Sequence, residues 1–365
     1  MIVSESDWSS IQRDWEDLYS SSAAAVIPLS FDWLRTWWST YGNEDEGLAL
    51  RILSLWRGSR LAGVLPLYQK RGPYGVLQLR FISTGEAEYE ETCPDYMNLM
   101  CLPGEETACA DAAWIAILKL KWDCLDLMDL PAEAALARSR LLPSTARIIP
   151  RGKCPTADLT GGFEAYLSRL SANTRAQARR MTREGERAGV QFALATDETA
   201  AAFFDDMALL HQSRWTARGK AGAFVGPRFL AFHRSLLAGW IVDGRAILAR
   251  LSLESESLAV LYGFVRDQAF SFYQAGVRIN DAMPLHSPGN LAHLLLMQNL
   301  AGRGVTTYDF LRGSAAYKER FAGGANALMR LQCWHKSARA RARRALVMLD
   351  TMARRGRRAM QSKLE

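Results

Sequence analysis

The chain has 365 residues, of which 49% are hydrophobic and 23% are charged, so it has the composition of a soluble globular protein and enough length for two domains of ordinary size. No uninterrupted apolar run of about 18 residues occurs, and the N-terminal region lacks the apolar core of a signal peptide, which argues against a membrane span and against export. The net charge of +7 arises in residues 336–365, where ten Lys or Arg face two acids, so the body of the chain is about neutral. We expect a cytoplasmic protein.

The first part of the chain is predicted to contain helices and then a β-meander. Residues 8–19 and 31–40 carry aromatic side chains three and four positions apart, which is helical spacing, and we interpret their tryptophans as core. Strand-like runs follow at residues 49–56, 61–69 and 77–83, and Gly-containing and Pro-containing turns separate them. This alternation of short strands and tight turns predicts the meander.

The two halves of the chain repeat one order of elements. Strands are followed by a Pro-Gly pair, a helix and another strand, first at Pro103-Gly104 and again at Pro288-Gly289. From Pro103 to the strand residue Asp126 is 23 positions, and from Pro288 to Asp309 is 21. The simplest account is an α/β fold, with mixed sheets, built from two tandem related units. The predicted strands that enclose the two helices are residues 77–83 and 124–130 in the first half, and 246–253, 257–266, 269–277 and 305–311 in the second.

A basic helix is predicted at residues 173–188, close to the start of the second unit. Four of its arginines recur every fourth position and therefore lie along one face. The row is either a solvated face balanced by nearby glutamates or a contact for a phosphorylated or polyanionic substrate, and both alternatives stay open. These arginines are Arg175, Arg179, Arg183 and Arg187. We place the domains at residues 1–160, 161–336 and 337–365.

The stretch from His286 to Phe321 is predicted to form a turn, a helix, a strand and a second helix. Pro288 and Gly289 shape a loop, and leucines at helical spacing then indicate a helix that begins near residue 290. The free N–H groups at such a helix start attract phosphate. Ser287 or Asn290 acting as an ordinary helix cap is the alternative.

Taken together, the motifs of this stretch resemble a known family. Ser-Pro-Gly at 287–289, a helix, Tyr-Asp-Phe-Leu-Arg-Gly at 308–313 and Ala-Ala-Tyr-Lys at 315–318 resemble the CelD-like branch of the GNAT acyl-CoA acyltransferase superfamily, a branch related to the Fem peptidoglycan aminoacyl transferases. The resemblance extends to Phe-Ser-Phe-Tyr-Gln-Ala-Gly-Val at 270–277 and to the basic helix. It also includes Phe-Asp-Trp-Leu at 31–34, and so covers nearly the whole chain apart from the tail.

The resemblance implies an N-acyltransferase that uses acetyl-CoA or another acyl-CoA. Its acceptor would be an amine of a sugar nucleotide, a polysaccharide precursor or a small molecule. An aminoacyl-tRNA-dependent Fem-like transferase is one alternative, favoured if the basic helix and the tail contact RNA. A non-catalytic binding protein of exopolysaccharide synthesis is another.

The resemblance also implies roles for individual residues. Tyr317 matches in placement the tyrosine that several GNAT enzymes use as a general acid for the leaving thiolate. Asp309 and Tyr273 would contact or deprotonate the acceptor, while Arg312 and Lys318 would hold an anionic group. Each also has an ordinary structural interpretation: Tyr273 as a core aromatic, Asp309 as a partner of Arg312, and Lys318 as a solvated helix residue. The expected grip on the cofactor pyrophosphate comes from His286, Ser287, Pro288, Gly289 and Asn290.

Additional substrate contacts are expected outside this stretch. Asp95 and Tyr96, ahead of the first Pro-Gly helix, would bind the acceptor, and Arg175 and Arg179 of the basic helix would contact an anion. The six cysteines and five histidines lack zinc-like spacing, so we expect no metal and reduced thiols.

The C-terminal tail is predicted to be a helix with a basic face, from Ser337 to Lys363. A short apolar patch, formed by Leu346, Leu349 and Met352, accompanies that face. Such a segment can lie on anionic lipid, bind RNA or merely solubilise the chain.

Overall fold

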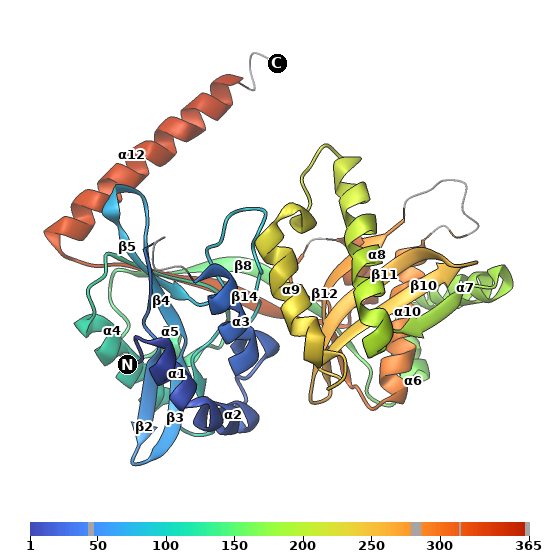
Figure 1. The fold of residues 1–365 in the computed structure, drawn as a ribbon, viewed down its shortest axis with the longest axis horizontal. Helices are drawn as coiled ribbons and strands as arrows, with labels where there is room; N and C mark the ends of the chain where they lie inside the picture. Colours follow the sequence, from blue (N-terminus) through green and yellow to red (C-terminus); the bar gives the residue numbers. More distant parts are fainter. Residues whose placement is uncertain (43–46, 279–284, 286, 314, 362–365) are drawn as a thin grey trace. The chain divides into compact units, whose positions relative to one another are not determined.

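The computed structural model describes residues 1–361 apart from 43–46, 279–284, 286 and 314, and it describes side chains through Met352. The described chain forms helices and mixed sheets (Figure 1), so the predicted α/β class is confirmed. Among the described helices, none is both long and apolar enough to cross a membrane.

Two compact units make up the chain. Unit 1 comprises Met1–Gly85, Cys93–Arg151 and Leu328–Glu365, and unit 2 comprises Glu86–Thr92 and Gly152–Ala327. The sequence suggested contiguous domains, whereas each unit here combines segments that are distant along the chain. This arises because two strands, β8 and β14, each begin in one unit and end in the other.

In unit 1 the aromatic helices pack as the core that the sequence predicts. Trp8, Trp15 and Trp33 are fully buried, and the indole of Trp15 donates to the carbonyl of Leu29 at 3.1 Å. Among the described residues, β5 and β7 pair in parallel, whereas β1–β4, β4–β5, β7–β14, β2–β3 and β3–β6 are antiparallel. The hydrogen-bonded strand orders are β1-β4-β5-β7-β14 and β2-β3-β6. The elements are α1 (Glu5–Ser10), α2 (Gln12–Ser21), η1 (Ile27–Leu29), α3 (Phe31–Tyr41), β1 (Leu48–Leu50), β2 (Leu53–Arg57), β3 (Arg60–Leu65), β4 (Leu67–Arg71), η3 (Pro73–Gly75), β5 (Leu77–Phe81), β6 (Met100–Cys101), α4 (Glu106–Lys119), β7 (Cys124–Pro131), α5 (Ala135–Arg138), β8 (Ala146–Asp158), β14 (Gly324–Trp334) and α12 (Ala338–Gln361).

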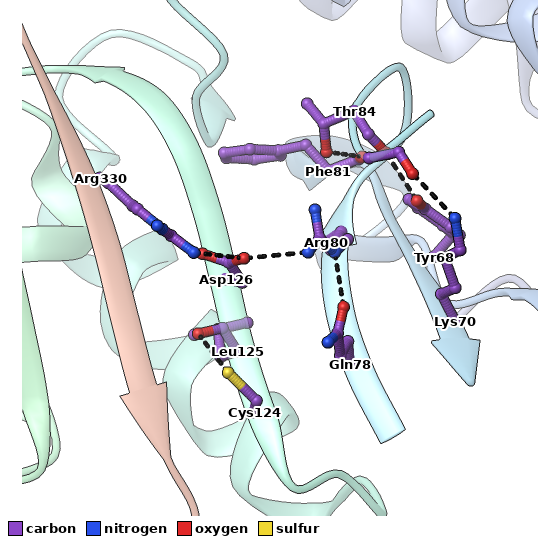
Figure 2. Close-up of polar contacts among 11 residues, drawn as sticks. Tyr68, Lys70, Gln78, Arg80, Phe81, Thr84, Cys124, Leu125, Asp126 and Arg330 are labelled. Atoms are coloured by element: carbon purple, nitrogen blue, oxygen red, sulfur yellow. Dashed lines mark hydrogen bonds and ion pairs between the residues drawn. The ribbon is translucent and has the colours of Figure 1, made fainter. Parts of the chain in front are cut away.

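A buried ion cluster lies directly after the parallel pair of unit 1. Asp126 of β7 is 3% exposed and accepts two hydrogen bonds from Arg330 of β14, at 2.5 and 2.8 Å. Figure 2 shows Arg80 of β5 reaching the same carboxylate from the other side, at 3.1 Å. Since both arginines contact one buried carboxylate, they connect three strands at this point.

Unit 2 is a sheet with helices on both faces, in the strand order β8-β13-β12-β11-β10-β9. One buried cluster joins α6, α7 and α10 to one face, and α8 and α9 contact the other face, for example through Phe204 and His233 against Tyr262. The predicted helix start near residue 290 is confirmed, at Pro288. The predicted strand 305–311 is shorter than expected, because the chain turns after Asp309. The elements are α6 (Phe163–Arg169), α7 (Ala172–Ala188), β9 (Gln191–Leu194), α8 (Asp197–Thr216), η4 (Ala223–Val225), α9 (Pro227–Trp240), β10 (Ala246–Leu253), β11 (Glu256–Arg266), β12 (Ala269–Val277), α10 (Pro288–Gly302), β13 (Thr307–Asp309) and α11 (Ala316–Phe321).

Candidate active site

Two parallel strands of unit 2 separate and leave a strand edge open. β12 and β13 pair only through Ala269↔Thr307, Phe270↔Tyr308 and Ser271↔Asp309. β12 then continues to Val277, and within the described residues no strand pairs with its 272–277 portion on the β13 side. Along that edge the N–H of Ala275 donates to the side chain of Gln274 at 3.0 Å. The other backbone amides and carbonyls of the edge are available to an extended ligand that itself contains amides.

Lys318 stabilises the turn at which β13 leaves the pair. Its side chain is 7% exposed, and its ammonium donates to the carbonyls of Phe310, Leu311 and Arg312 at 2.7, 3.1 and 3.0 Å. An ammonium has three N–H donors, and three carbonyls accept from it here. The turn needs this support because Leu311 adopts the left-handed conformation, with φ at +52°. Lys318 is thus a buried structural cation in this state and not a solvated residue.

Asp309 lies at the same turn. It is 7% exposed, and its Oδ1 accepts from the backbone N–H of Leu311 at 2.7 Å. Arg312, the third carbonyl partner of Lys318, is half-buried and runs beside Gly152, where a Cβ would lie 3.8 Å from the arginine side chain. Both residues therefore belong to the turn that shapes the separated strands.

Aromatic side chains line the separation behind this turn. His293 of α10 stacks on Tyr317 of α11, with ring centroids 5.0 Å apart, and its other neighbours are Phe272 at 4.6 Å and Phe310 at 5.6 Å. The Tyr308 hydroxyl is 2.7 Å from Nδ1 of His293. Burial, with a smaller contribution from Lys318, lowers the pKa of His293 to about 3, so the imidazole is neutral at physiological pH.

Tyr317 combines a packed ring with an available hydroxyl. Within the described residues the hydroxyl has no hydrogen-bond partner, while the ring packs against His293 and Phe310. Burial raises the pKa of Tyr317, and the positive charge of Arg214 opposes that rise. Tyr317 is therefore protonated at neutral pH and is a competent proton donor.

A pocket of about 230 Å³ opens at the start of α10. Ser287 caps the helix by position, yet its side chain makes no capping hydrogen bond, and Asn290 lies in the first turn. Gly289 allows close approach to β12, since a Cβ there would lie 3.1 Å from Val277. The full lining is Gln177, Arg180, Met181, Glu184, Leu285, Ser287, Asn290, Leu291 and Arg320.

The pocket lining carries net positive charge. Arg180 of α7 pairs with Glu184 at 2.7 Å, and within the described residues Arg320 of α11 has no ion-pair partner. Two arginines against one glutamate leave one positive charge beside the N–H groups of the helix start. These features all favour an anionic group in the pocket.

Of the residues predicted to grip the cofactor, Ser287 and Asn290 line this pocket. Pro288 and Gly289 form the first turn of α10, and His286 lies outside the described residues. Tyr273 is not brought together with Tyr317: its hydroxyl donates to the carbonyl of Thr92 at 2.7 Å and lies 3.1 Å from Nε2 of His233. Tyr273 packs against His233 of α9, whereas Phe272 packs against His293 of α10, so these two residues of β12 point to opposite faces of the sheet.

The predicted anion contacts of the basic helix are engaged elsewhere. Arg175 donates to the carbonyls of Ser168 and Leu170, and Arg179 pairs with Glu164 at 3.1 Å, so both join α7 to α6. Among the α7 arginines it is Arg180, outside the four-residue row, that lines the pocket. The predicted acceptor contacts Asp95 and Tyr96 belong to unit 1, where Asp95 is 5% exposed and Tyr96 has φ at +66°.

Sequence reasoning missed four residues of this site. His293, Arg180, Arg214 and Arg320 carry no motif, and only Arg180 had a signal, because it comes directly after Arg179 in a helix already recognised as basic. In the described part of the chain, no three His, Cys, Asp or Glu side chains converge as metal ligands would. All six cysteines are reduced thiols, and Cys93 alone among them is exposed.

Comparison with known proteins agrees with this geometry. Residues 172–319 match the family model of the acetyltransferase (GNAT) domain. The match runs from the start of α7 into α11 and contains the separated strands, Tyr317 and every pocket residue except Arg320, which lies one position beyond it. No curated protein matches the chain. The resemblance inferred from sequence is thereby confirmed at the level of a GNAT domain, while the CelD-like branch stays a prediction.

Solved structures with a similar fold match almost the whole chain. FemX superimposes with a TM-score of 0.59 at 12% identity, covering 89% of this chain and 96% of FemX. A conserved protein of unknown function from Bacteroides thetaiotaomicron has a TM-score of 0.56 at 10% identity, with 89% and 97% covered. The C-terminal domain of a putative lysylphosphatidylglycerol synthetase from Agrobacterium fabrum has a TM-score of 0.53 at 13% identity, with 93% and 95% covered. At these identities the likeness establishes the fold.

Proposed function

We propose that this chain is an acyl-CoA-dependent N-acyltransferase that acts on an amine of a sugar, a polysaccharide precursor or a small molecule. The observation that carries the proposal is the cationic pocket at the start of α10, whose lining lies inside the segment that matches a GNAT domain except for Arg320, one position beyond it. A diphosphate suits this pocket because helix N–H groups and Arg320 favour negative charge. CoA carries such a diphosphate, attached to an arm that contains two amides.

The open edge of β12 supports the placement of that arm. Backbone groups of residues 272–277 would pair with its amides as a neighbouring strand would. Gly289 keeps the pocket close to Val277, where β12 ends, so the diphosphate and the arm would bind next to each other. This arrangement would direct the thioester toward Tyr317.

Tyr317 is the proposed general acid. The amine nitrogen bonds to the thioester carbon, the C–S bond breaks, and the departing thiolate takes the phenolic proton. The surplus proton of the nitrogen then passes through solvent to the Tyr317 phenolate and restores the phenol. His293 would hold the ring of Tyr317 in place, and its neutral form avoids placing a second cation next to Lys318. Asp309 stays a candidate to contact the acceptor amine, whereas Tyr273 is already bound to Thr92 and His233.

Calorimetric titration with acetyl-CoA tests the proposal. Arg320→Gln removes a pocket cation, and Arg303→Gln removes an exposed arginine at the opposite end of α10. We expect Arg320→Gln to weaken acetyl-CoA binding by about tenfold or more, the usual cost of losing one charge-assisted hydrogen bond. Arg303→Gln should bind as the wild type does. Equal affinity of all three proteins would exclude the pocket as the diphosphate site.

An aminoacyl-tRNA-dependent transferase is the second candidate. Arg183 and Arg187 of α7 are exposed and have no ion-pair partner within the described residues, so they are available to a polyanion, and the fold resembles that of FemX. Under this alternative, the double variant Arg183→Gln/Arg187→Gln would lose affinity for aminoacyl-tRNA. Under the first proposal it would keep its affinity for acetyl-CoA and its turnover.

A further inference from the structure

The C-terminal helix α12 is attached to unit 1 through its first turns. Asp123 is fully buried, and its carboxylate accepts from Arg339 at 2.9 Å and from Arg343 at 2.6 Å. The same carboxylate accepts from the backbone N–H of Leu77 at 2.9 Å. Because two arginines one turn apart bind one buried carboxylate, the beginning of the helix is held firmly in unit 1.

Beyond this attachment, α12 exposes apolar side chains. Leu346, Met348, Leu349 and Met352 are 45%, 49%, 64% and 63% exposed, respectively. Leu346, Leu349 and Met352 are three positions apart, so they lie along one face. Single exposed apolar residues are common on proteins, but four within two helical turns are not. Figure 1 shows α12 extending past the strands and helices of unit 1.

The charge of this segment indicates which kind of partner covers the apolar face. Residues 336–365 contain ten Lys or Arg and two acids, and two of the ten, Arg339 and Arg343, bind Asp123. Arg341 is exposed, and the described residues provide it with no ion-pair partner. Positive charge alone suits RNA as well as lipid. A contiguous apolar face favours lipid, because phosphate contacts supply most of the affinity for RNA and give no burial to leucine and methionine.

We propose that α12 is a docking surface for a lipid bilayer that contains anionic headgroups. Leu346, Leu349 and Met352 enter the boundary between headgroups and acyl chains, and Arg341 contacts the phosphates. The helix lies along the surface, and the Asp123 attachment brings unit 1 to the bilayer. This inference is independent of the reaction that unit 2 performs.

Vesicle co-sedimentation of the full chain tests the proposal. The probes are vesicles of phosphatidylcholine with and without phosphatidylglycerol, at low salt and at about 0.15 M salt, where the Debye length is roughly 8 Å. Leu349→Glu places an acid in the apolar face, and Leu209→Glu is a matched control, since Leu209 is 67% exposed on α8. Both side chains are exposed, so neither change should alter the unfolding temperature, and calorimetry verifies this.

We expect wild type and Leu209→Glu to bind the anionic vesicles, more weakly as salt rises, and to bind pure phosphatidylcholine poorly. Leu349→Glu should reduce vesicle binding about tenfold or more. The substitution removes an apolar side chain that the bilayer would bury, and it adds a negative charge that the anionic headgroups repel. Arg341→Gln should reduce vesicle binding about fivefold. The proposal is overturned if Leu349→Glu binds like the wild type. It is likewise overturned if a single-stranded RNA oligomer binds in preference to the vesicles with Leu349→Glu unaffected.

Discussion

The described residues of each unit contain a parallel strand pair with a helix in the connection, β5–β7 in unit 1 and β12–β13 in unit 2. The two pairs differ in the residues that come directly after the paired positions. In unit 1, β5 and β7 pair through Leu79↔Leu125, and the next residues are Arg80 and Asp126. The carboxylate of Asp126 binds both Arg80 and Arg330. In unit 2, the residues after the Ser271↔Asp309 pair are Phe272 and Phe310, and His293 lies against both rings. In unit 1 ion pairs hold the strands together after the paired positions. In unit 2 the strands separate, and neutral aromatic side chains lie between them.

The starts of α4 in unit 1 and α10 in unit 2 also differ in the charge of the residues around them. Glu105 and Glu106 stand at the start of α4, where they disfavour an anion, and a cavity of about 470 Å³ there includes Glu106 in its lining. At the start of α10 the polar neighbours include Arg180 and Arg320. Similar backbones thus provide one site suited to a phosphorylated cofactor and one that is not, because the residues after the strand and around the helix start decide the chemistry.

Acid should affect the two units differently. Burial lowers the pKa of His233 and His293 to about 3 and, with a smaller effect of Arg214, that of His211 to about 4. All three are in unit 2, and an unfolded histidine has a pKa of roughly 6.5. Below that pH these histidines bind protons in the unfolded state but stay neutral in the folded state. The free energy of unfolding of unit 2 therefore falls by on the order of 1 kcal/mol per histidine per pH unit.

Hydrogen exchange followed by mass spectrometry from pH 7 to pH 5 measures this difference, after correction for the intrinsic pH dependence of exchange. We expect protection to fall in α8, α9 and α10 while β5 and β7 of unit 1 keep theirs. In unit 1, burial raises the pKa of Asp123, but Leu77, Arg343 and Arg339 outweigh it and hold the pKa below its usual range. Its contribution is therefore present above about pH 4 and is lost only as the pH falls through that lowered value. An equal loss of protection in both units would contradict the conclusion that the buried histidines make unit 2 the more acid-sensitive unit.

Asp126→Asn tests whether the ion cluster stabilises the parallel strand pair of unit 1. The substitution leaves Arg80 and Arg330 around a neutral amide, and removing one partner of a buried ion pair costs about 3–5 kcal/mol. Urea denaturation measures the change, with the exposed Asp243→Asn as the control. Acetyl-CoA affinity should be unchanged, and a large loss of affinity would mean that the two pairs are not independent.

Lys318→Met is the corresponding change in unit 2. Three carbonyls lose their shared donor, and we expect a loss of roughly 3 kcal/mol in the free energy of unfolding together with lower turnover. Lys119→Met, at an exposed position of α4, controls for the loss of charge. Unchanged stability would show that the turn after β13 does not depend on the buried ammonium.

Tyr317→Phe tests the chemistry that distinguishes unit 2. The ring packing on His293 persists while the donor is lost, so turnover should fall on the order of 10²-fold and acyl-CoA binding should persist. Steady-state kinetics and calorimetry measure the two quantities, with Tyr89→Phe at an exposed position as the control. Undiminished turnover would eliminate Tyr317 as the acid, and lost binding in a folded variant would recast it as a cofactor contact.

Local features of the fold were predictable from the sequence alone. They are the start of α10 at Pro288, the repeat of Pro-Gly, helix and strand in both halves, the buried tryptophans and the tail helix. Each depends on residues within a few positions of one another: apolar spacing, a turn-forming pair or a run of arginines. The pocket residues Ser287 and Asn290 could be predicted from the sequence for the same reason, because they lie beside the Pro-Gly pair that begins the helix.

Partners distant along the chain were decided only by the tertiary structure. Arg330 reaches Asp126 across 204 positions, and Arg343 reaches Asp123 across 220. Lys318 has the sequence context of a solvated helix residue, yet it is buried on three carbonyls, and His293 gains its role from Tyr308 and Tyr317 on other elements. Sequence spacing specifies which face of an element a side chain occupies. Which group it meets there depends on how the elements pack, and that no local pattern encodes.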